Sequence, residues 1–223
     1  MAAQLWWIVH KDLMCEWRGR QAWPAMLMLG TVVVFVFSLQ IESLPQQKPA
    51  LAGGLLWLAV FFAGVFALDR SFAAEREAGC WDGLKLYPVS PGVIYAGKLI
   101  VNIVGLFALE GVLVPLFAAV ADIPLLQRPA ALVLIAACGN AAIAAVGTLL
   151  AALAAGIRRS GSLTALLVLP MTVPVVLAAA EATRLMMAGE LGPAWWRWIQ
   201  FLAAFAVVFI TAGILLFQLV VEE

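Results

Sequence analysis

The stretch "LIVNIVGLFALEGVLVPLFAAVA", Leu99–Ala121, is long and apolar enough to cross a lipid bilayer as a single helix. A transmembrane helix needs about 20 mostly apolar residues, because the hydrocarbon core is roughly 30 Å thick and each residue rises about 1.5 Å. The stretch holds one acidic residue, Glu110, near its centre. A charged side chain at that depth costs roughly 2.5–3.5 kcal/mol on insertion scales. Glu110 should therefore be protonated, paired or directed at a polar interior.

The partner of Glu110 is expected to be a neutral polar group. No lysine or arginine occurs at a matching depth in any other apolar stretch of the chain. The candidates are a side chain such as Asn140, a water molecule, or a residue of another subunit. A structural hydrogen bond is favoured over a functional role for Glu110, and both readings stay open.

The composition extends this membrane assignment to the whole chain. Of 223 residues, 65% are hydrophobic and 12% are charged, far from the balance of a soluble domain. Alternating strands typical of a barrel are absent, and a formal net charge of zero argues against a nucleic-acid surface. We predict an all-α integral membrane protein, one transmembrane permease domain over residues 1–223 without a cleavable signal peptide. Its six spans are expected at 25–39, 51–68, 99–121, 130–157, 163–180 and 199–221.

The distribution of lysine and arginine predicts the orientation. Basic residues gather on the cytoplasmic side of membrane proteins. One side of the expected topology has nine of them, against four on the other. The nine are Lys11, Arg18, Arg20, Arg70, Arg76, Lys85, Lys98, Arg158 and Arg159. We therefore expect a multi-pass protein of the bacterial inner membrane with both termini in the cytoplasm.

Residues 4–20 are expected to form an amphipathic helix that lies in the cytoplasmic membrane interface. Trp6, Val9, Leu13 and Trp17 recur at helical spacing, and Lys11 belongs to another, polar face. Such a helix is either a topology anchor or a docking site for a partner.

The sequence gives little support for a metal, haem or catalytic site. His10 is the single histidine, so one chain cannot build a bis-histidine haem site. The cysteines Cys15, Cys80 and Cys138 have no CxxC spacing and are read as free thiols. An intramembrane enzyme is disfavoured because only one deep carboxylate is present. We predict a non-catalytic subunit that binds no cofactor or metal by itself.

The polar passage "REAGCWDGLKLYPVSPGVIY", residues 76–95, separates the second and third spans. Gly79 is expected to end one helix, and Trp81–Tyr87 to form a short amphipathic helix that stops at Pro88. Ser90 then reads as an N-cap, with Pro91 in the first helical turn. An ordered loop of this length favours a docking surface over a plain connector. We define residues 75–88 as the coupling segment.

Three further expectations concern the second half of the chain. The alanine- and glycine-rich fourth span should lie in the bundle interior, because small residues let helices approach closely. Pro170 and Pro174 should bend the fifth span. Residues 181–193 are expected to form a separate short amphipathic insertion on the outer side, before the sixth span.

The layout resembles the membrane subunit of type-2 ABC transporters, and one local match is narrower. The segment "DRSFAAEREAGCWDGLKLYPVSPGVIYAGK", residues 69–98, is similar to the cytoplasmic segment of the haem exporter protein B (CcmB) family of the cytochrome c maturation system. The matching features are the charged run 75–77, Gly79, a leucine-containing run from Gly83, Pro88 and a lysine, Lys98. Cys80 and Trp81 depart from the family, where more polar residues are expected.

The resemblance implies a type-2 ABC exporter-like fold in which residues 75–88 form a cytoplasmic coupling helix. The partners would be a CcmA-like ATPase, a CcmC-like haem-handling subunit, a CcmD-like small subunit and, indirectly, a CcmE-like haem chaperone. ATP would be bound by the ATPase, which agrees with the absence of a G-x-x-x-x-G-K-[ST] motif here. Haem would be handled by the complex. The residues implied in ATPase docking are Glu75, Arg76, Glu77, Trp81, Asp82, Gly83, Leu84 and Leu86.

The functional alternative is another type-2 ABC permease, which would export a drug, a lipid or a polysaccharide. Copurification with a CcmC-like subunit would separate the two. Whether the chain conducts haem or only drives release of a haem-loaded chaperone also stays open, and the lack of a bis-histidine site favours release.

Overall fold

The described part of the protein is almost entirely helical. The computed structural model describes residues 2–19, 22–44, 46–70, 89–156 and 163–222. The helices are α1 (Ala2–Gly19), α2 (Ala22–Glu42), α3 (Lys48–Arg70), α6 (Pro91–Ala121), the 3-10 helix η1 (Leu125–Gln127), α7 (Pro129–Gly156), α8 (Leu163–Ala188) and α9 (Pro193–Glu222). The all-α fold class is confirmed.

Six of these helices are long and apolar enough to cross a bilayer, which confirms the expected number of spans. Their apolar windows are Trp23–Glu42, Lys48–Val65, Pro91–Ala121, Pro129–Leu153, Leu167–Ala188 and Pro193–Phe217. The third span starts at Pro91 instead of Leu99, because α6 continues unbroken from its proline-marked first turn.

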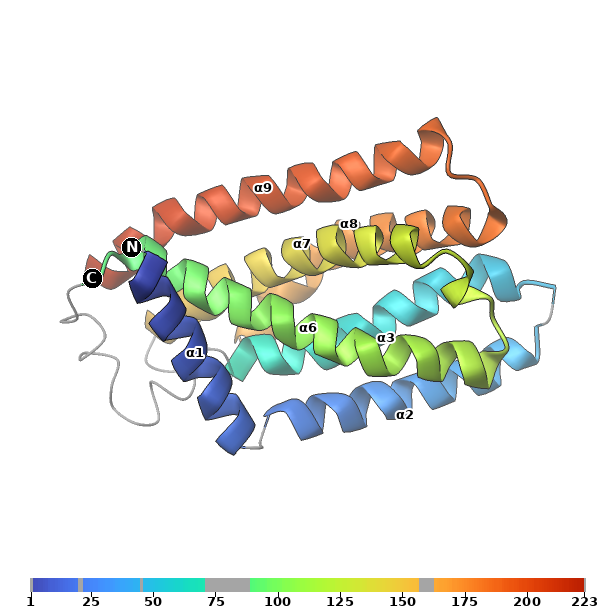
Figure 1. Ribbon diagram of the computed structural model, residues 1–223, viewed down its shortest axis with the longest axis horizontal. Helices are drawn as coiled ribbons and strands as arrows, with labels where there is room; N and C mark the ends of the chain where they lie inside the picture. Colours follow the sequence, from blue (N-terminus) through green and yellow to red (C-terminus); the bar gives the residue numbers. More distant parts are fainter. Residues whose placement is uncertain (1, 20–21, 45, 71–88, 157–162, 223) are drawn as a thin grey trace.

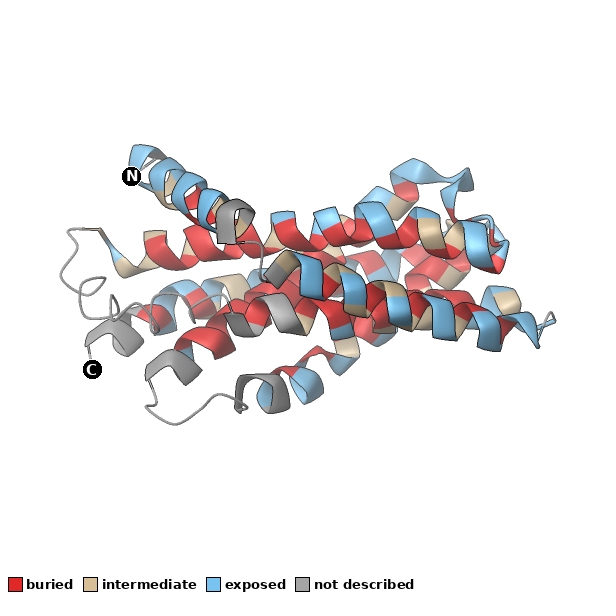
Figure 2. Ribbon diagram, turned by 90° about the horizontal axis from the view of Figure 1, so that it is seen from below, coloured by how far each residue is buried: buried red, intermediate tan, exposed pale blue. Residues whose placement is uncertain are grey.

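The six long helices run side by side along the bundle, and α1 crosses them obliquely at one end (Figures 1 and 2). Helix α7 packs most extensively against α9 and α8, and α3 packs against α8 and α2. Both chain termini lie at the same end of the bundle, as an even number of spans requires (Figure 1). The start of α6 and the end of α3 lie at that end too.

Helix α7 forms the interior of the bundle, as its small residues predict. Residues 142–146 are completely buried, and the burial colours in Figure 2 follow the inward faces of the helices. Two glycines permit the closest approaches. At Gly139 a side chain would collide with the indole ring of Trp57 in α3, and at Gly147 a Cβ would lie 2.5 Å from Leu68 Cδ1. Because Gly139 and Gly147 carry no side chain, α7 can lie this close to α3.

Residues 181–188 are not a separate insertion, contrary to the expectation from their polarity. They form the last two turns of α8, which runs unbroken to Ala188 and ends at Gly189, where φ is +84°. The polar side chains are accommodated within the helix. Arg184 Nη2 lies 2.6 Å from Glu181 Oε1, and the Thr183 hydroxyl donates to the carbonyl oxygen of Ala179 at 2.8 Å. Their apolar neighbours are buried, so the inward stripe of α8 continues.

Filling the space at Gly139 should destabilise the bundle. We expect Gly139→Val to cost about 1–3 kcal/mol of unfolding free energy, because the added atoms would overlap Trp57. The ring cannot swing away freely, since it is buried and its Nε1 donates to Thr183 Oγ1 at 3.0 Å. Thermal unfolding of the purified protein in detergent measures the change.

Gly111→Val is the matched control, because a Cβ at Gly111, also in the middle of a spanning helix, would meet no described atom of another helix within 4 Å. Equal melting temperatures for the two variants would contradict the close contact between α3 and α7.

Candidate functional site

The candidate site is the first half of α6, which follows directly after the coupling segment. Ser90 has an extended backbone (φ −61°, ψ 137°) and Pro91 lies in the first turn, so the predicted helix start is confirmed. The Ser90 hydroxyl makes no capping hydrogen bond; the turn is closed by the Val93 amide, which donates to the Ser90 carbonyl at 2.9 Å. The predicted docking residues Glu75, Arg76, Glu77, Trp81, Asp82, Gly83, Leu84 and Leu86 lie outside the described residues.

Tyr95 joins α6 to α7 and α9. Its side chain is fully buried, and its hydroxyl donates to the carbonyl oxygen of Ala145 in α7 at 3.0 Å. The same hydroxyl lies 3.5 Å from the carbonyl oxygen of Phe209 in α9. The ring rests on Gly213 of α9, where a Cβ would collide with it. Three helices therefore meet at one phenol.

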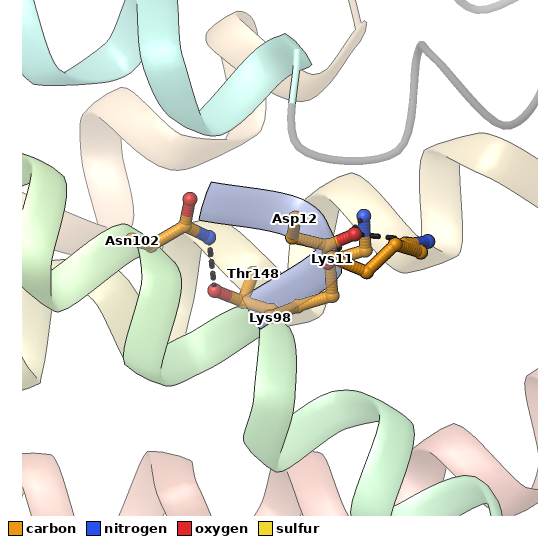
Figure 3. A network of polar contacts seen from close by, with 5 residues as sticks. All are labelled: Lys11, Asp12, Lys98, Asn102 and Thr148. Atoms are coloured by element: carbon orange, nitrogen blue, oxygen red, sulfur yellow. Dashed lines mark hydrogen bonds and ion pairs between the residues drawn. The ribbon is translucent and has the colours of Figure 1, made fainter. Parts of the chain in front are cut away.

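A buried ion pair joins α6 to α1. Lys98 Nζ lies 3.0 Å from Asp12 Oδ2, and each side chain is only 7% exposed. Lys11 Nζ approaches the other carboxylate oxygen at 2.9 Å from the solvent side (Figure 3). Gly97 supports the contact, because a Cβ there would lie 2.6 Å from Ile8 Cγ2. Buried charges are tolerated only when they are paired, so this contact fixes where α1 crosses α6.

Two amide contacts join α6 to α7 further along the helix. Asn102 Nδ2 donates to Thr148 Oγ1 at 2.8 Å (Figure 3), and Asn140 Nδ2 donates to Glu110 Oε2 at 2.8 Å. In the second contact Glu110 meets Asn140, which is one of the three kinds of partner that the sequence left open for it. Both pairs are buried and follow one antiparallel register, since the step from 102 to 110 is matched by the step from 148 to 140.

The contacts of Tyr95, Lys98 and Asn102 form a junction between the first half of α6 and the helices α1, α7 and α9. Within the described ranges, no group of three His, Cys, Asp or Glu side chains could hold a metal ion. The junction connects the first half of α6 to α1 through Lys98, to α9 through Tyr95 and to α7 through Tyr95 and Asn102.

Comparison with known proteins identifies the family. The profile of the family described as CcmB protein matches residues 3–220. The chain belongs to the CcmB family. It is 33% identical to "Heme exporter protein B" of Rhodobacter capsulatus over 179 residues, which cover 79% of this chain and 81% of the relative. It is also 27% identical to the protein of that name from Pseudomonas aeruginosa over 181 residues, 81% of each chain. The Escherichia coli K12 relative is 28% identical over 180 residues, 79% of this chain and 80% of the relative.

Sequence reasoning missed the Asp12–Lys98 pair in this member of the CcmB family. It placed Lys98 among the cytoplasmic charges and did not consider Asp12. A usable signal was present: Asp12 follows Ile8 by four residues and Val9 by three, so an acid interrupts an otherwise apolar helix face.

The faces of α1 also differ from the expectation. The stripe predicted through Trp6 and Val9 is divided, because Val9 is buried whereas Trp6 is 66% exposed. The buried face of α1 passes through Ile8, Val9 and Asp12 instead. His10 is exposed, with its ring centroid 6.3 Å from that of Trp6. Exposed tryptophans on the outward face suit an interfacial helix, and that location stays a prediction.

Breaking the Asp12–Lys98 pair should loosen α1. We expect Lys98→Met to cost about 3 kcal/mol, near the lower end for a buried pair, because Lys11 still faces the remaining carboxylate. The double variant Asp12→Leu/Lys98→Met should recover much of that loss, since neither charge is then left buried. Thermal unfolding of the four proteins of this double-mutant cycle gives the coupling free energy between Asp12 and Lys98.

Lys11→Met serves as the control and should have a much smaller effect, because the Lys11 side chain is 52% exposed. Strictly additive losses for Asp12→Leu and Lys98→Met would show that the two side chains are not coupled.

Proposed function

We propose that this chain is the membrane subunit of an ATP-driven, ABC-type complex of cytochrome c biogenesis that transports or delivers haem. The observation that carries the proposal is the match to the CcmB family over residues 3–220, supported by relatives named Heme exporter protein B. In this proposal the chain is a non-catalytic permease-type subunit, and the ATPase is a separate CcmA-like protein. The complex occupies the bacterial inner membrane, with both termini of this chain in the cytoplasm.

The coupling segment receives motion from the ATPase in this proposal. Trp81, Leu84 and Leu86 are the apolar anchors, because buried aromatic and aliphatic groups carry most of the energy of an interface. Glu75, Glu77 and Asp82 meet bases at its rim, and these exposed charges steer association more than they add affinity. Arg76 and Gly83 complete the segment. Closure of the ATPase dimer displaces this segment and with it the start of α6.

The contacts of α6 determine how such a displacement is distributed. Tyr95 and Asn102 attach α6 to α7 at 3.0 and 2.8 Å, and Lys98 attaches it to α1 at 3.0 Å. Because all three side chains are buried, sliding α6 alone would leave polar groups without partners in a dry interior. The less costly response is a joint movement of α1, α6 and α7.

Haem is the cargo of the complex in this proposal, and this chain is not its resident binder. The single histidine, His10, is exposed on α1, and no cluster of three ligating side chains was found among the described residues. A CcmC-like subunit handles the haem, a CcmD-like small protein accompanies it, and a CcmE-like chaperone carries the haem away.

Replacing the central anchor of the coupling segment should uncouple the ATPase. We expect Trp81→Asp to reduce recovery of the ATPase at least tenfold in pull-downs of the tagged membrane subunit, because an anchor residue is typically worth 2 kcal/mol or more. Insertion of the variant into the membrane should be unchanged. Leu126→Asp is the matched control, since Leu126 is exposed in η1, which follows the end of α6 and lies at the end of the bundle opposite to the start of that helix. Wild-type recovery of the ATPase with Trp81→Asp would refute the docking assignment.

The haem spectrum should not depend on His10. We expect His10→Ala to leave the absorption spectrum of the purified, haem-loaded complex unchanged, because the ring lies exposed beside Trp6 and has no second histidine in its own chain. A shifted Soret band or lost haem would assign His10 as a ligand and contradict the proposal that this chain does not hold the cargo.

A further inference from the structure

Glu110 and Asn140 meet in the middle of the bundle, away from the junction at the start of α6. Glu110 lies within the span Pro91–Ala121 and Asn140 within the span Pro129–Leu153. The Glu110 residue is 6% exposed and Asn140 is completely buried. Asn140 Nδ2 donates to Glu110 Oε2 at 2.8 Å.

This amide is the only polar partner that Glu110 has among the described residues. Lys98 precedes it by twelve positions, ~18 Å along α6, and is paired with Asp12. At the other end, Lys48 donates to the carbonyl oxygen of Ala121, ~16 Å further along the helix. An ionised Glu110 would thus be a buried charge with a single neutral hydrogen-bond donor, which is an unfavourable arrangement in a membrane span.

The other end of the amide supplies a second, independent observation. Asn140 Oδ1 is buried and accepts no hydrogen bond. It belongs to the same planar group as Nδ2, which already contacts the carboxyl of Glu110. An ionised carboxylate offers only acceptors to this oxygen, whereas a protonated carboxyl offers an O–H donor. One proton on Glu110 would remove the buried charge and would also supply a donor of the kind that the orphaned oxygen lacks.

We propose that Glu110 and Asn140 form a proton-binding site within the membrane-spanning bundle. The Glu110 carboxyl carries a proton, taken from water as the chain assembles, and donates it to Asn140 Oδ1 while its other oxygen accepts from Asn140 Nδ2. The pair is then a neutral, two-bond link between α6 and α7. The pairs Glu110–Asn140 and Asn102–Thr148 then join α6 to α7 in the same register, and neither pair carries net charge.

Infrared difference spectroscopy of the full chain in lipid nanodiscs at neutral pH tests the site. A protonated carboxyl has a C=O stretch above the amide I band, whereas a carboxylate has two bands below it. We expect the spectrum of wild type minus Glu110→Gln to show loss of one carboxyl band. Loss of carboxylate bands in that spectrum would overturn the proposal.

Glu181→Gln is the matched control on α8. Glu181 is half-buried and ion-paired with Arg184 at 2.6 Å, so this difference spectrum should show loss of carboxylate bands only. In Asn140→Leu the carboxyl band should move to higher frequency, because both hydrogen bonds to Glu110 are lost. An unmoved band would show that Asn140 does not bind the proton-carrying group.

Stability gives a second readout. The Gln side chain has a carbonyl acceptor and an amide N–H donor in the places of the C=O and O–H of a protonated Glu, so Glu110→Gln should keep the wild-type melting temperature whereas Glu110→Leu should lower it. Equal losses for the two variants would contradict the two-bond pair. If Glu110→Gln does not accumulate, wild-type protein grown with glutamate carrying a heavy carbon isotope in its carboxyl decides. An isotope-shifted carboxyl band supports the site, and its absence overturns it.

Discussion

The bilayer interior offers no water to polar side chains, so each polar group on a spanning helix needs a partner within the protein, on its own helix or on another. Helix α6 is where this constraint acts most strongly. Its buried Tyr95, Lys98, Asn102 and Glu110 each reach a different position on α7, α9 or α1. The arrangement of these helices is therefore specified by the pairing of a few polar groups, because apolar contacts alone would tolerate many alternatives in lipid.

Close packing at glycines holds together helices that no polar pair joins in the described part of the chain. Between α7 and α3 the contact is made by Trp57 and Leu68, which fill the spaces left by Gly139 and Gly147. Trp57 combines both principles, since its ring packs on a glycine while its indole nitrogen donates to Thr183 in α8. Small residues thus let the helices approach, and single hydrogen bonds then fix their register. The interior of α7 needs no large side chains for this reason.

The position of α1 links the architecture to the proposed activity. An interfacial helix held only by its apolar face could slide along the membrane, but the Asp12–Lys98 pair ties α1 to a fixed turn of α6. That turn lies two helical turns after Ser90, where the chain enters α6 from the coupling segment. In the proposed complex, movement of the coupling segment would therefore displace α1 at the membrane surface as well as the helices of the bundle.

The amino-acid sequence alone determined the fold class, the six spans, the start of α6 at Ser90–Pro91 and the interior place of α7. These follow from length, hydropathy and backbone chemistry, which act within one helix. It also indicated Asn140 for Glu110, because a deep carboxylate leaves few partners. Only the tertiary structure decided that Lys98 meets Asp12, that the outward face of α1 presents Trp6, and that residues 181–188 prolong α8. Those features depend on which helix lies against which, and a linear pattern of residues does not contain that information.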